Sequence, residues 1–205
     1  MRIHFTRHGE SQANIQRVIS NRDLPHPLTA AGRDQARALA ERLKGIPLTH
    51  ICSSPVPRAL ETAEIIGTAF GLPIQAAEGL KEYDCGILEG RGDEAAWAVH
   101  KRFFLDWLEG RSRDMAPEGG ETFFDIRNRL GGFLRELADR HGGSRSEILC
   151  VSHGGTLLFG LPGLFANVDL SFVRKRRIGH ASIISAEDHG GKLFCTQWDD
   201  VPFGF

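Results

Sequence analysis

The chain has 205 residues, of which 41% are hydrophobic and 25% charged, and its formal net charge is −1. These values are ordinary for a globular protein, and this length suits one α/β domain with a full apolar core. The charge balance excludes a global attraction to nucleic acid or to an anionic membrane. No stretch approaches the ~20 apolar residues of a membrane span, and the N-terminus lacks an apolar signal region. We therefore expect a soluble, cytoplasmic protein with no nucleic-acid and no membrane partner.

Strand and helix signals alternate along the first 76 residues. The predicted elements are a strand at 1–6, a helix from Thr29 to Lys44, a strand at 49–53, a helix from Pro57 to Gly71, and a strand at 73–76. Thr29 is a good helix cap, Pro57 can open a helix and Gly71 can end one. Alternation of this kind favours βαβ units and a largely parallel sheet.

The second half is less regular at first and then resumes the pattern. We predict a helix at 94–109, a long helix beginning at Thr122, a buried strand at 147–152, and two antiparallel strands within 178–199 that turn at 188–191. The fold class is therefore a three-layer α/β sandwich, with a mostly parallel central sheet and helices on both faces. The chain forms a single domain, 1–205, in which residues 83–121 are a small cap-like insertion over the active edge of the sheet.

The four cysteines are far apart and form no CxxC pair; they are Cys52, Cys85, Cys150 and Cys195. A disulfide framework is not expected in a chain of this length, and Cys52 and Cys150 lie in apolar runs typical of the core. The histidines show no metal-ligand spacing and there is no HExxH motif. We predict neither a metal site nor a cofactor.

Polar side chains follow three predicted strands at the point where each strand ends. Arg7 and His8 follow the first, Ser53-Ser54-Pro55 leads from the second to Arg58, and His153 follows the strand at 147–152. Carboxyl ends of parallel strands meet at one edge of a sheet, so these groups can converge. Two arginines and two histidines would bind a phosphate dianion, and the glycines after both histidines, Gly9 and Gly154-Gly155, would let backbone N–H groups approach it.

A cationic pocket binds phosphate but does not by itself cleave a phosphate ester. Cleavage needs a nucleophile, which an imidazole can be, and a proton for the leaving oxygen. Glu82 is the candidate for the proton donor, a role worth typically ~10²–10⁴ in rate.

These motifs, taken together, resemble those of the histidine phosphatase superfamily, also called the phosphoglycerate mutase-like family, over nearly the whole chain. They are Arg7-His8-Gly9-Glu10-Ser11 with Asn14; Leu28-Thr29 with Gly32, Gln35 and Ala36; Ser53-Ser54-Pro55 with Arg58, Ala59, Thr62 and Ala63; Leu80 and Glu82 with Gly86, Glu89 and Gly90; Pro117 with Gly119-Gly120-Glu121; and Val151-Ser152-His153-Gly154-Gly155. One such motif is weak, but six in family order and spacing are specific. Ser20-Asn21 departs from the Gln-Gly of many relatives, and Thr122 from a serine.

The resemblance implies catalytic roles for three residues. His8 is similar to the nucleophile that becomes phosphohistidine, Glu82 to the acid that protonates the leaving group and then activates water, and His153 to a phosphate ligand at the catalytic centre. A hydrogen bond from the other ring nitrogen of His8 would fix the tautomer that attacks. The resemblance also implies a phosphate pocket containing Arg7, Arg58 and Asn14.

The expected function is a metal-independent phosphomonoesterase, of the histidine acid phosphatase type, that acts on a small phosphate ester as a monomer or homodimer. A cofactor-dependent phosphoglycerate mutase is the alternative, although only residues 83–118 separate Glu82 from Gly119, which is short for a mutase. A non-catalytic phospho-ligand-binding domain is a third possibility. We interpret the basic run Arg174–Arg177 as a solvated surface segment, and we do not count His180 among the site residues.

Overall fold

The computed structural model describes residues 1–22, 24–199 and 201–203. These residues contain one seven-stranded sheet in the order β3-β2-β4-β1-β5-β6-β7. Its strands are β1 (Arg2–Arg7), β2 (His50–Ser53), β3 (Ile74–Ala76), β4 (Glu147–Ser152), β5 (Ile183–His189), β6 (Lys192–Trp198) and β7 (Val201–Pro202). The first four strands pair in parallel, and β5, β6 and β7 extend the sheet in antiparallel fashion.

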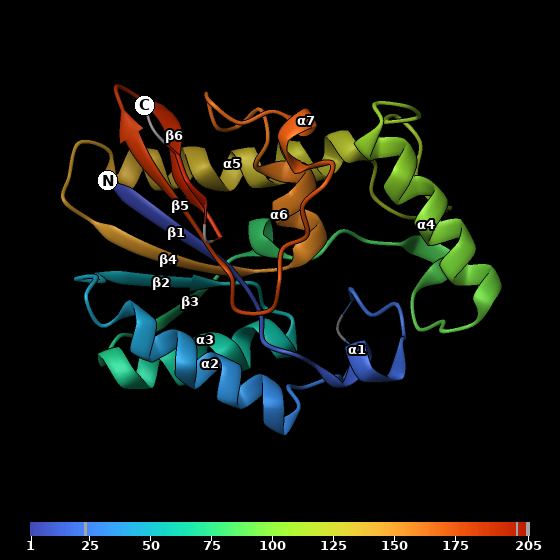
Figure 1. Ribbon diagram of the computed structural model, residues 1–205, viewed down its shortest axis with the longest axis horizontal. Coiled ribbons are helices and arrows are strands. Elements are labelled where there is room, and N and C mark those ends of the chain that lie inside the picture. Colours follow the sequence, from blue (N-terminus) through green and yellow to red (C-terminus); the bar gives the residue numbers. More distant parts are fainter. Residues whose placement is uncertain (23, 200, 204–205) are drawn as a thin grey trace.

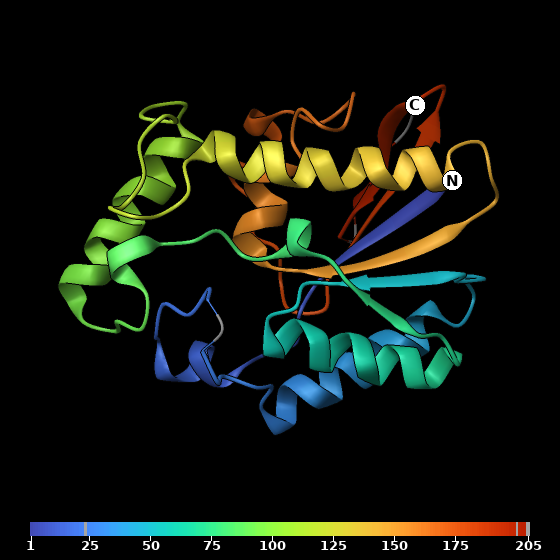
Figure 2. The ribbon, with the colours of Figure 1, turned by 180° about the vertical axis from the view of Figure 1, so that it is seen from behind.

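Helices cover both faces of the sheet, which confirms the predicted α/β sandwich (Figures 1 and 2). They are α1 (Gln12–Gln16), α2 (Ala30–Leu43), α3 (Pro57–Phe70), α4 (Glu94–Leu108), α5 (Phe123–His141), α6 (Gly154–Gly160) and α7 (Leu170–Val173), with 3₁₀ turns at Glu78–Leu80 and Gly86–Leu88. Helices α2 and α3 cover one face, while α5 and α6 cover the other. Helix α4 stands to one side, beyond the carboxyl ends of β1 and β4.

Local sequence signals set several element boundaries. The Thr29 hydroxyl accepts a hydrogen bond from the Gly32 N–H and caps α2, and Gly71 ends α3 with φ +66°. Thr122 and Asp125 form a reciprocal capping box at the start of α5. These boundaries confirm the predictions at Thr29, Gly71 and Thr122. The sequence did not predict the short helices α1, α6 and α7, and α6 begins where only a turn was expected.

Each face of the sheet has its own apolar core. The α2 and α3 side packs Leu39, Ala63 and Ile66 against the sheet, and the α5 and α6 side buries a larger cluster that includes Trp107 and Phe159. All four cysteines are free and buried, which agrees with the core positions predicted for Cys52 and Cys150. No helix in the described part of the chain is both long and apolar enough to cross a membrane.

Candidate active site

The register of the parallel sheet places two histidines side by side. Arg7 of β1 pairs with Ser152 of β4, so the next residue of each strand, His8 and His153, leaves the sheet at the same level. The His8 N–H donates to the Ser152 carbonyl at 3.0 Å, and the two imidazole centroids lie 5.1 Å apart. Both side chains are buried. Two residues that are 145 positions apart in sequence therefore share one site.

Hydrogen bonds define the protonation state of His8. Its Nδ1 lies 2.6 Å from the Gly9 carbonyl, which can only accept, so Nδ1 carries the proton. The Nε of Arg58 donates to Nε2 at 2.9 Å, so Nε2 presents its lone pair. Burial lowers the pKa of His8 well below its ordinary value, and the charge of Arg58 lowers it further. The site therefore holds a neutral imidazole, with the hydrogen bond at the second nitrogen that the sequence predicted.

Two arginine side chains, the buried Arg58 and the half-buried Arg7, place their charges near this imidazole. Arg58, at the N-terminus of α3, is 4% exposed; burial, with repulsion from Arg7, lowers its pKa to about 10 against the opposing pull of Glu82. It stays charged at neutral pH. Arg7 is fixed by a hydrogen bond from Nη1 to the Ile178 carbonyl at 2.9 Å. Together they place two fixed positive charges beside His8.

Several buried polar atoms of the site have no hydrogen-bond partner. They are Arg7 Nε, Arg58 Nη1, His153 Nδ1 and His180 Nε2, and within the described residues only Trp198 Nε1 shares this condition elsewhere. Leaving such an atom unpaired costs roughly 1–3 kcal/mol. Their concentration around one histidine marks a place where an anionic ligand, bringing several acceptor oxygens, would satisfy them.

His180 belongs to this group although the sequence did not place it there. Its ring centroid lies 5.9 Å from that of His8, and burial together with the charge of Arg7 lowers its pKa to about 4. It stands just before β5, the antiparallel neighbour of β1, where the backbone N–H of Ala181 donates to the Arg7 carbonyl. The only available signal was its place at the start of the predicted tail strand.

The N-terminus of α6 receives the carboxylate of Glu82. Oε1 accepts hydrogen bonds from the Thr156 N–H at 2.7 Å and the Tyr83 N–H at 3.1 Å, whereas Oε2 accepts one from the Gly155 N–H at 3.0 Å. The backbone of Gly155 is thus engaged by Glu82. This corrects the expectation for Gly155, whose N–H is not available to a phosphate although both Gly154 and Gly155 line the cavity. The N–H of Gly9 likewise donates to the Thr62 hydroxyl, at 3.1 Å.

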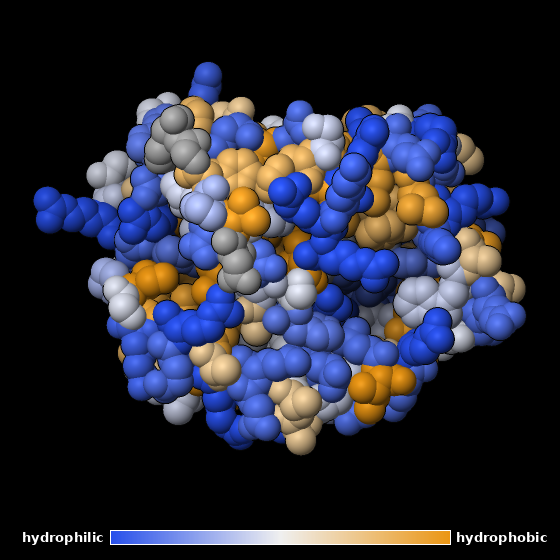
Figure 3. All heavy atoms as spheres, viewed as in Figure 1, coloured by the Kyte–Doolittle hydropathy of each residue, from blue (hydrophilic) through white to orange (hydrophobic). Residues whose placement is uncertain are grey.

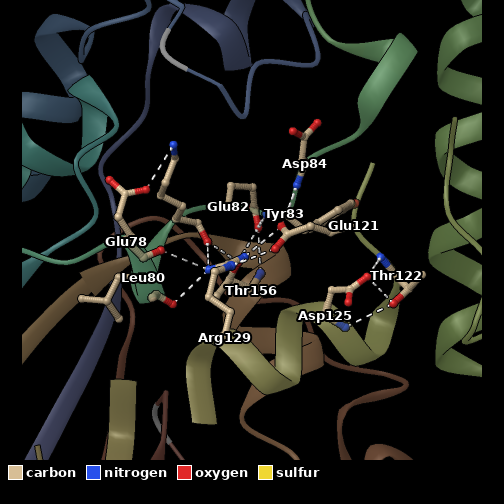
Figure 4. A network of polar contacts seen from close by, with 12 residues as sticks. Glu78, Leu80, Glu82, Tyr83, Asp84, Glu121, Thr122, Asp125, Arg129 and Thr156 are labelled. Atoms are coloured by element: carbon tan, nitrogen blue, oxygen red, sulfur yellow. Dashed lines mark hydrogen bonds and ion pairs between the residues drawn. The ribbon is translucent and has the colours of Figure 1, made fainter. Parts of the chain in front are cut away.

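A second layer of contacts fixes the segment that carries Glu82 (Figure 4). Arg129 of α5 donates to the carbonyls of Gly79 and Lys81 and forms a bidentate ion pair with Glu121. Glu121 in turn accepts from the Asp84 N–H at 2.9 Å. The segment on both sides of Glu82 is therefore tied to α5, which limits the positions open to the carboxylate.

These groups lie on a cavity of about 680 Å³. Its lining includes Arg7, His8, Asn14, Arg58, Glu82 and Gly154, and the fully buried His153 lies next to the lining residue His8. The Asn14 oxygen accepts from the Ser11 N–H at 2.9 Å, so the amide nitrogen is the end left for a ligand. The structure thus brings together every residue that the sequence proposed for the site.

The cavity also recruits side chains from α4 and from the basic run. Of the aromatic residues on α4, Trp107 is fully buried, whereas Trp97 and Phe104 line the cavity. The run Arg174–Arg177 is largely exposed, as expected, but it lines the cavity mouth instead of an unrelated surface. Within the described residues, no three His, Cys, Asp or Glu side chains are grouped so that they could hold a metal ion.

A neutral histidine between two arginines, at the carboxyl edge of parallel strands, defines a class of α/β enzymes that handle phosphate esters. The chain belongs to the histidine phosphatase superfamily (branch 1), whose family model matches residues 3–201. It is 31% identical over 201 residues to the Salmonella choleraesuis (strain SC-B67) protein named "Probable phosphoglycerate mutase GpmB", covering 97% of this chain and 90% of that protein.

Solved structures extend the comparison. YhfR of Bacillus stearothermophilus is 29% identical, with a TM-score of 0.83 and coverage of 98% of this chain and 97% of that one. A mycobacterial glucosyl-3-phosphoglycerate phosphatase in complex with VO3 is 26% identical, with a TM-score of 0.83 and coverage of 97% and 98%. The relatives therefore include proteins named as phosphatases and proteins named as a mutase.

Proposed function

We propose that this protein is a metal-independent phosphomonoesterase that works through a phosphohistidine on His8. The observation that carries the proposal is the state of the His8 ring. It is neutral, its proton is fixed on Nδ1 by the Gly9 carbonyl, and its Nε2 lone pair faces the buried Arg58, with the charge of Arg7 also near the ring. A nucleophile prepared in this way, beside unsatisfied donors, fits an attack on a bound phosphoryl group.

In the first step, the phosphate oxygens of the ester take the donors of Arg7, Arg58 and His153 that have no partner in the free protein. The Arg58 Nε–H must leave the lone pair of His8 Nε2, which then attacks phosphorus as the bond to the ester oxygen breaks. Protonated Glu82 gives its proton to the departing alkoxide. Oε2 is the better carrier of that proton, because Oε1 already accepts from two backbone N–H groups.

In the second step, the Glu82 carboxylate takes a proton from water as the water oxygen attacks phosphorus. The P–Nε2 bond breaks, inorganic phosphate leaves, and both His8 and Glu82 return to their starting states. For phosphate to contact His153 at Nδ1, that nitrogen must carry the proton. The Ser54 hydroxyl, 2.8 Å from Nε2, can donate to the other side of the ring.

Hydrolysis is favoured over isomerisation by the short connection of residues 83–118 between Glu82 and Gly119. A mutase must keep its phosphohistidine away from water while the reaction intermediate reorients in the site. Solved relatives named as phosphatases cover nearly the whole chain, and this agrees with hydrolysis. The name of the Salmonella relative supports the alternative, so the experiment includes both reactions.

The first experiment traps the intermediate. The protein is mixed with a ³²P-labelled phosphate ester, quenched, and examined for an acid-labile, alkali-stable adduct. Wild-type protein and His50→Ala, whose histidine is exposed and distant from the site, should label, whereas His8→Ala should not. Label in His8→Ala would refute the assignment of the nucleophile, and phosphate binding without any turnover by wild type would indicate a non-catalytic domain.

The second experiment supplies 3-phosphoglycerate with catalytic 2,3-bisphosphoglycerate and follows 2-phosphoglycerate beside free phosphate. We expect phosphate release to exceed isomerisation. Isomerisation well above phosphate release would refute the phosphatase assignment and establish the mutase.

A further inference from the structure

The mouth of the cavity carries a ring of positive charge that the proposed chemistry does not use. It consists of Arg17 at the end of α1, Lys101 on α4, and the four consecutive residues Arg174–Arg177 that follow α7; we call these six residues the basic rim. Figure 3 shows the cavity mouth as a hollow bordered by strongly hydrophilic residues. Three segments that are distant in sequence therefore supply charge of one sign to one opening.

Few carboxylates lie near the basic rim; the one electrostatic partner seen for it among the described residues is Asp169, whose pKa the charge of Arg174 helps to lower. Of the described residues that line the cavity, eight are arginine or lysine and one, Glu82, is a carboxylate. None of the six rim residues has an ion-pair partner among the described residues, although ion pairs are frequent elsewhere on the surface, such as Arg33 with Glu61 and Arg129 with Glu121. Since the whole chain has a net charge of −1, this concentration of positive charge is local.

Part of the rim is fixed in position. Arg174 donates from Nε to the Leu108 carbonyl at the end of α4, at 3.1 Å. Arg176 donates from Nη1 to the Phe172 carbonyl, and its guanidinium lies 3.7 Å from the centre of the Phe172 ring. The backbone between them is therefore tied to both α4 and α7. Lys175 and Arg177 make no side-chain hydrogen bond within the described residues and are free to meet a ligand.

The cavity that contains the phosphate pocket and the rim also has a part whose wall is apolar. Trp97, Phe104, Leu105, Leu108 and Leu158 all line the same cavity. A ligand whose phosphate sits at His8 can therefore lay a carbon skeleton along this wall, and the rim lies where the skeleton emerges. The anchoring of Arg174 to Leu108 joins the rim to that wall.

We propose that the substrates of this protein are phosphate esters whose alcohol part carries a second anionic group, a carboxylate or another phosphate, beyond an apolar spacer. The inference rests on the proposed function for the choice of reaction but concerns a different part of the cavity. The basic rim, with Lys175 and Arg177 foremost, binds the second anion. Cations without an ion-pair partner gain more free energy from contact with such an anion than cations that are already paired.

The test compares two esters that differ only at the remote end. Both are phosphates of a phenol with a three-carbon chain in the para position; the chain ends in a carboxylate in one and in the neutral amide in the other. The three-carbon chain separates the remote group from the phenol oxygen, so the two esters have leaving groups of nearly equal reactivity. Two ratios are measured. The first is kcat/KM for the acid ester divided by kcat/KM for the amide ester. The second is the ratio of the dissociation constants of the two esters for His8→Ala protein, obtained by calorimetry. A bisphosphate of the same skeleton distinguishes a carboxylate from a phosphate preference.

We expect wild type to favour the acid about tenfold at low salt, since one exposed charge contact alters affinity by up to roughly fivefold and two are involved. The ratio should fall toward one in the double variant Lys175→Gln/Arg177→Gln. It should also fall between ~0.05 and ~0.5 M salt, as screening shortens the reach of the rim. Arg145→Gln, which removes an exposed arginine from the loop before β4, should leave the ratio unaltered.

Equal values for acid and amide in wild type, or an acid preference that survives in the double variant, would overturn the proposal. Absence of turnover for both esters and for p-nitrophenyl phosphate would instead refute the proposed function. The calorimetric ratio in His8→Ala protein would then still decide the question of the second anion.

Discussion

The contact between α6 and Glu82 makes Gly155 the most informative position for mutation. A Cβ at Gly155 would lie 2.2 Å from Cε1 of Tyr83 and 2.9 Å from Oε1 of Glu82. At Gly154 the nearest atom, Cδ of Arg7, is 3.4 Å away, which is close to ordinary contact. The pair Gly155→Ala and Gly154→Ala therefore adds the same methyl group, one residue apart, with and without a clash.

The size of the effect follows from the geometry. Carbon atoms pack at about 3.5 Å or more, so the ring of Tyr83 or the start of α6 must move by about 1.3 Å. Tyr83 is 5% exposed and its hydroxyl lies 2.7 Å from His100 Nε2, which leaves it little space. Overpacking of this kind typically costs about 1–3 kcal/mol, or roughly 2–10 °C in Tm for a domain of this size.

The catalytic loss should exceed the loss of stability. A displacement of about 1 Å in a catalytic group can cost about 10²-fold in rate. We therefore expect Gly155→Ala to lower kcat about 10²-fold for phenyl phosphate, with a small change in KM, because Glu82 acts on the leaving group. Gly154→Ala should keep kcat within about threefold of wild type, since the methyl group adds no clash and alanine suits a helix. Any effect of its contact with Arg7 Nε, 3.4 Å away, should appear in KM.

The assay is steady-state kinetics below the unfolding transition of each variant, with the transition followed by circular dichroism. If folded Gly155→Ala protein had the kcat of wild type, the catalytic role of Glu82 would not depend on its contact with the N-terminus of α6. Equal losses in both glycine variants would show that the helix start, and not the Glu82 contact, is the sensitive feature.

Three further predictions concern individual groups. Glu82→Gln should lower kcat strongly for phenyl phosphate but much less for p-nitrophenyl phosphate, whose leaving group needs little protonation; equal losses would indicate another proton donor. Because burial lowers the pKa of His8 well below 6.5, ¹⁵N NMR spectra should show the native ring neutral at pH values where the ring of the urea-unfolded chain, with a pKa of about 6.5, is already protonated. Protonation of His8 therefore favours the unfolded state, so its contribution to the free energy of unfolding is present above pH 6.5 and is lost on acidification. A native His8 that protonates at pH 6 would contradict this. Activity should persist in EDTA, and loss that a divalent cation restores would refute metal independence.

Many features of this fold could be predicted before the structure was known. Caps at Thr29 and Thr122, the helix end at Gly71, and the apolar run before His153 act through neighbours only a few residues away, so they can be read without a fold. Residues that follow strands are likewise predictable as members of one site, because a parallel sheet gathers its carboxyl ends on one edge. This is how His8 and His153 were identified together.

Tertiary structure decided what depends on packing between distant segments. The register of β1 with β4 set the 5.1 Å separation of the two imidazoles, and the Gly9 carbonyl fixed the tautomer of His8. The engagement of Gly155 by Glu82 arises where the 78–84 segment crosses the start of α6, which no local pattern shows. The sequence shows that the run Arg174–Arg177 is positively charged, but only the path of the chain after α7 places this run at the cavity. Composition states how many charges a segment carries; the fold determines which opening they face.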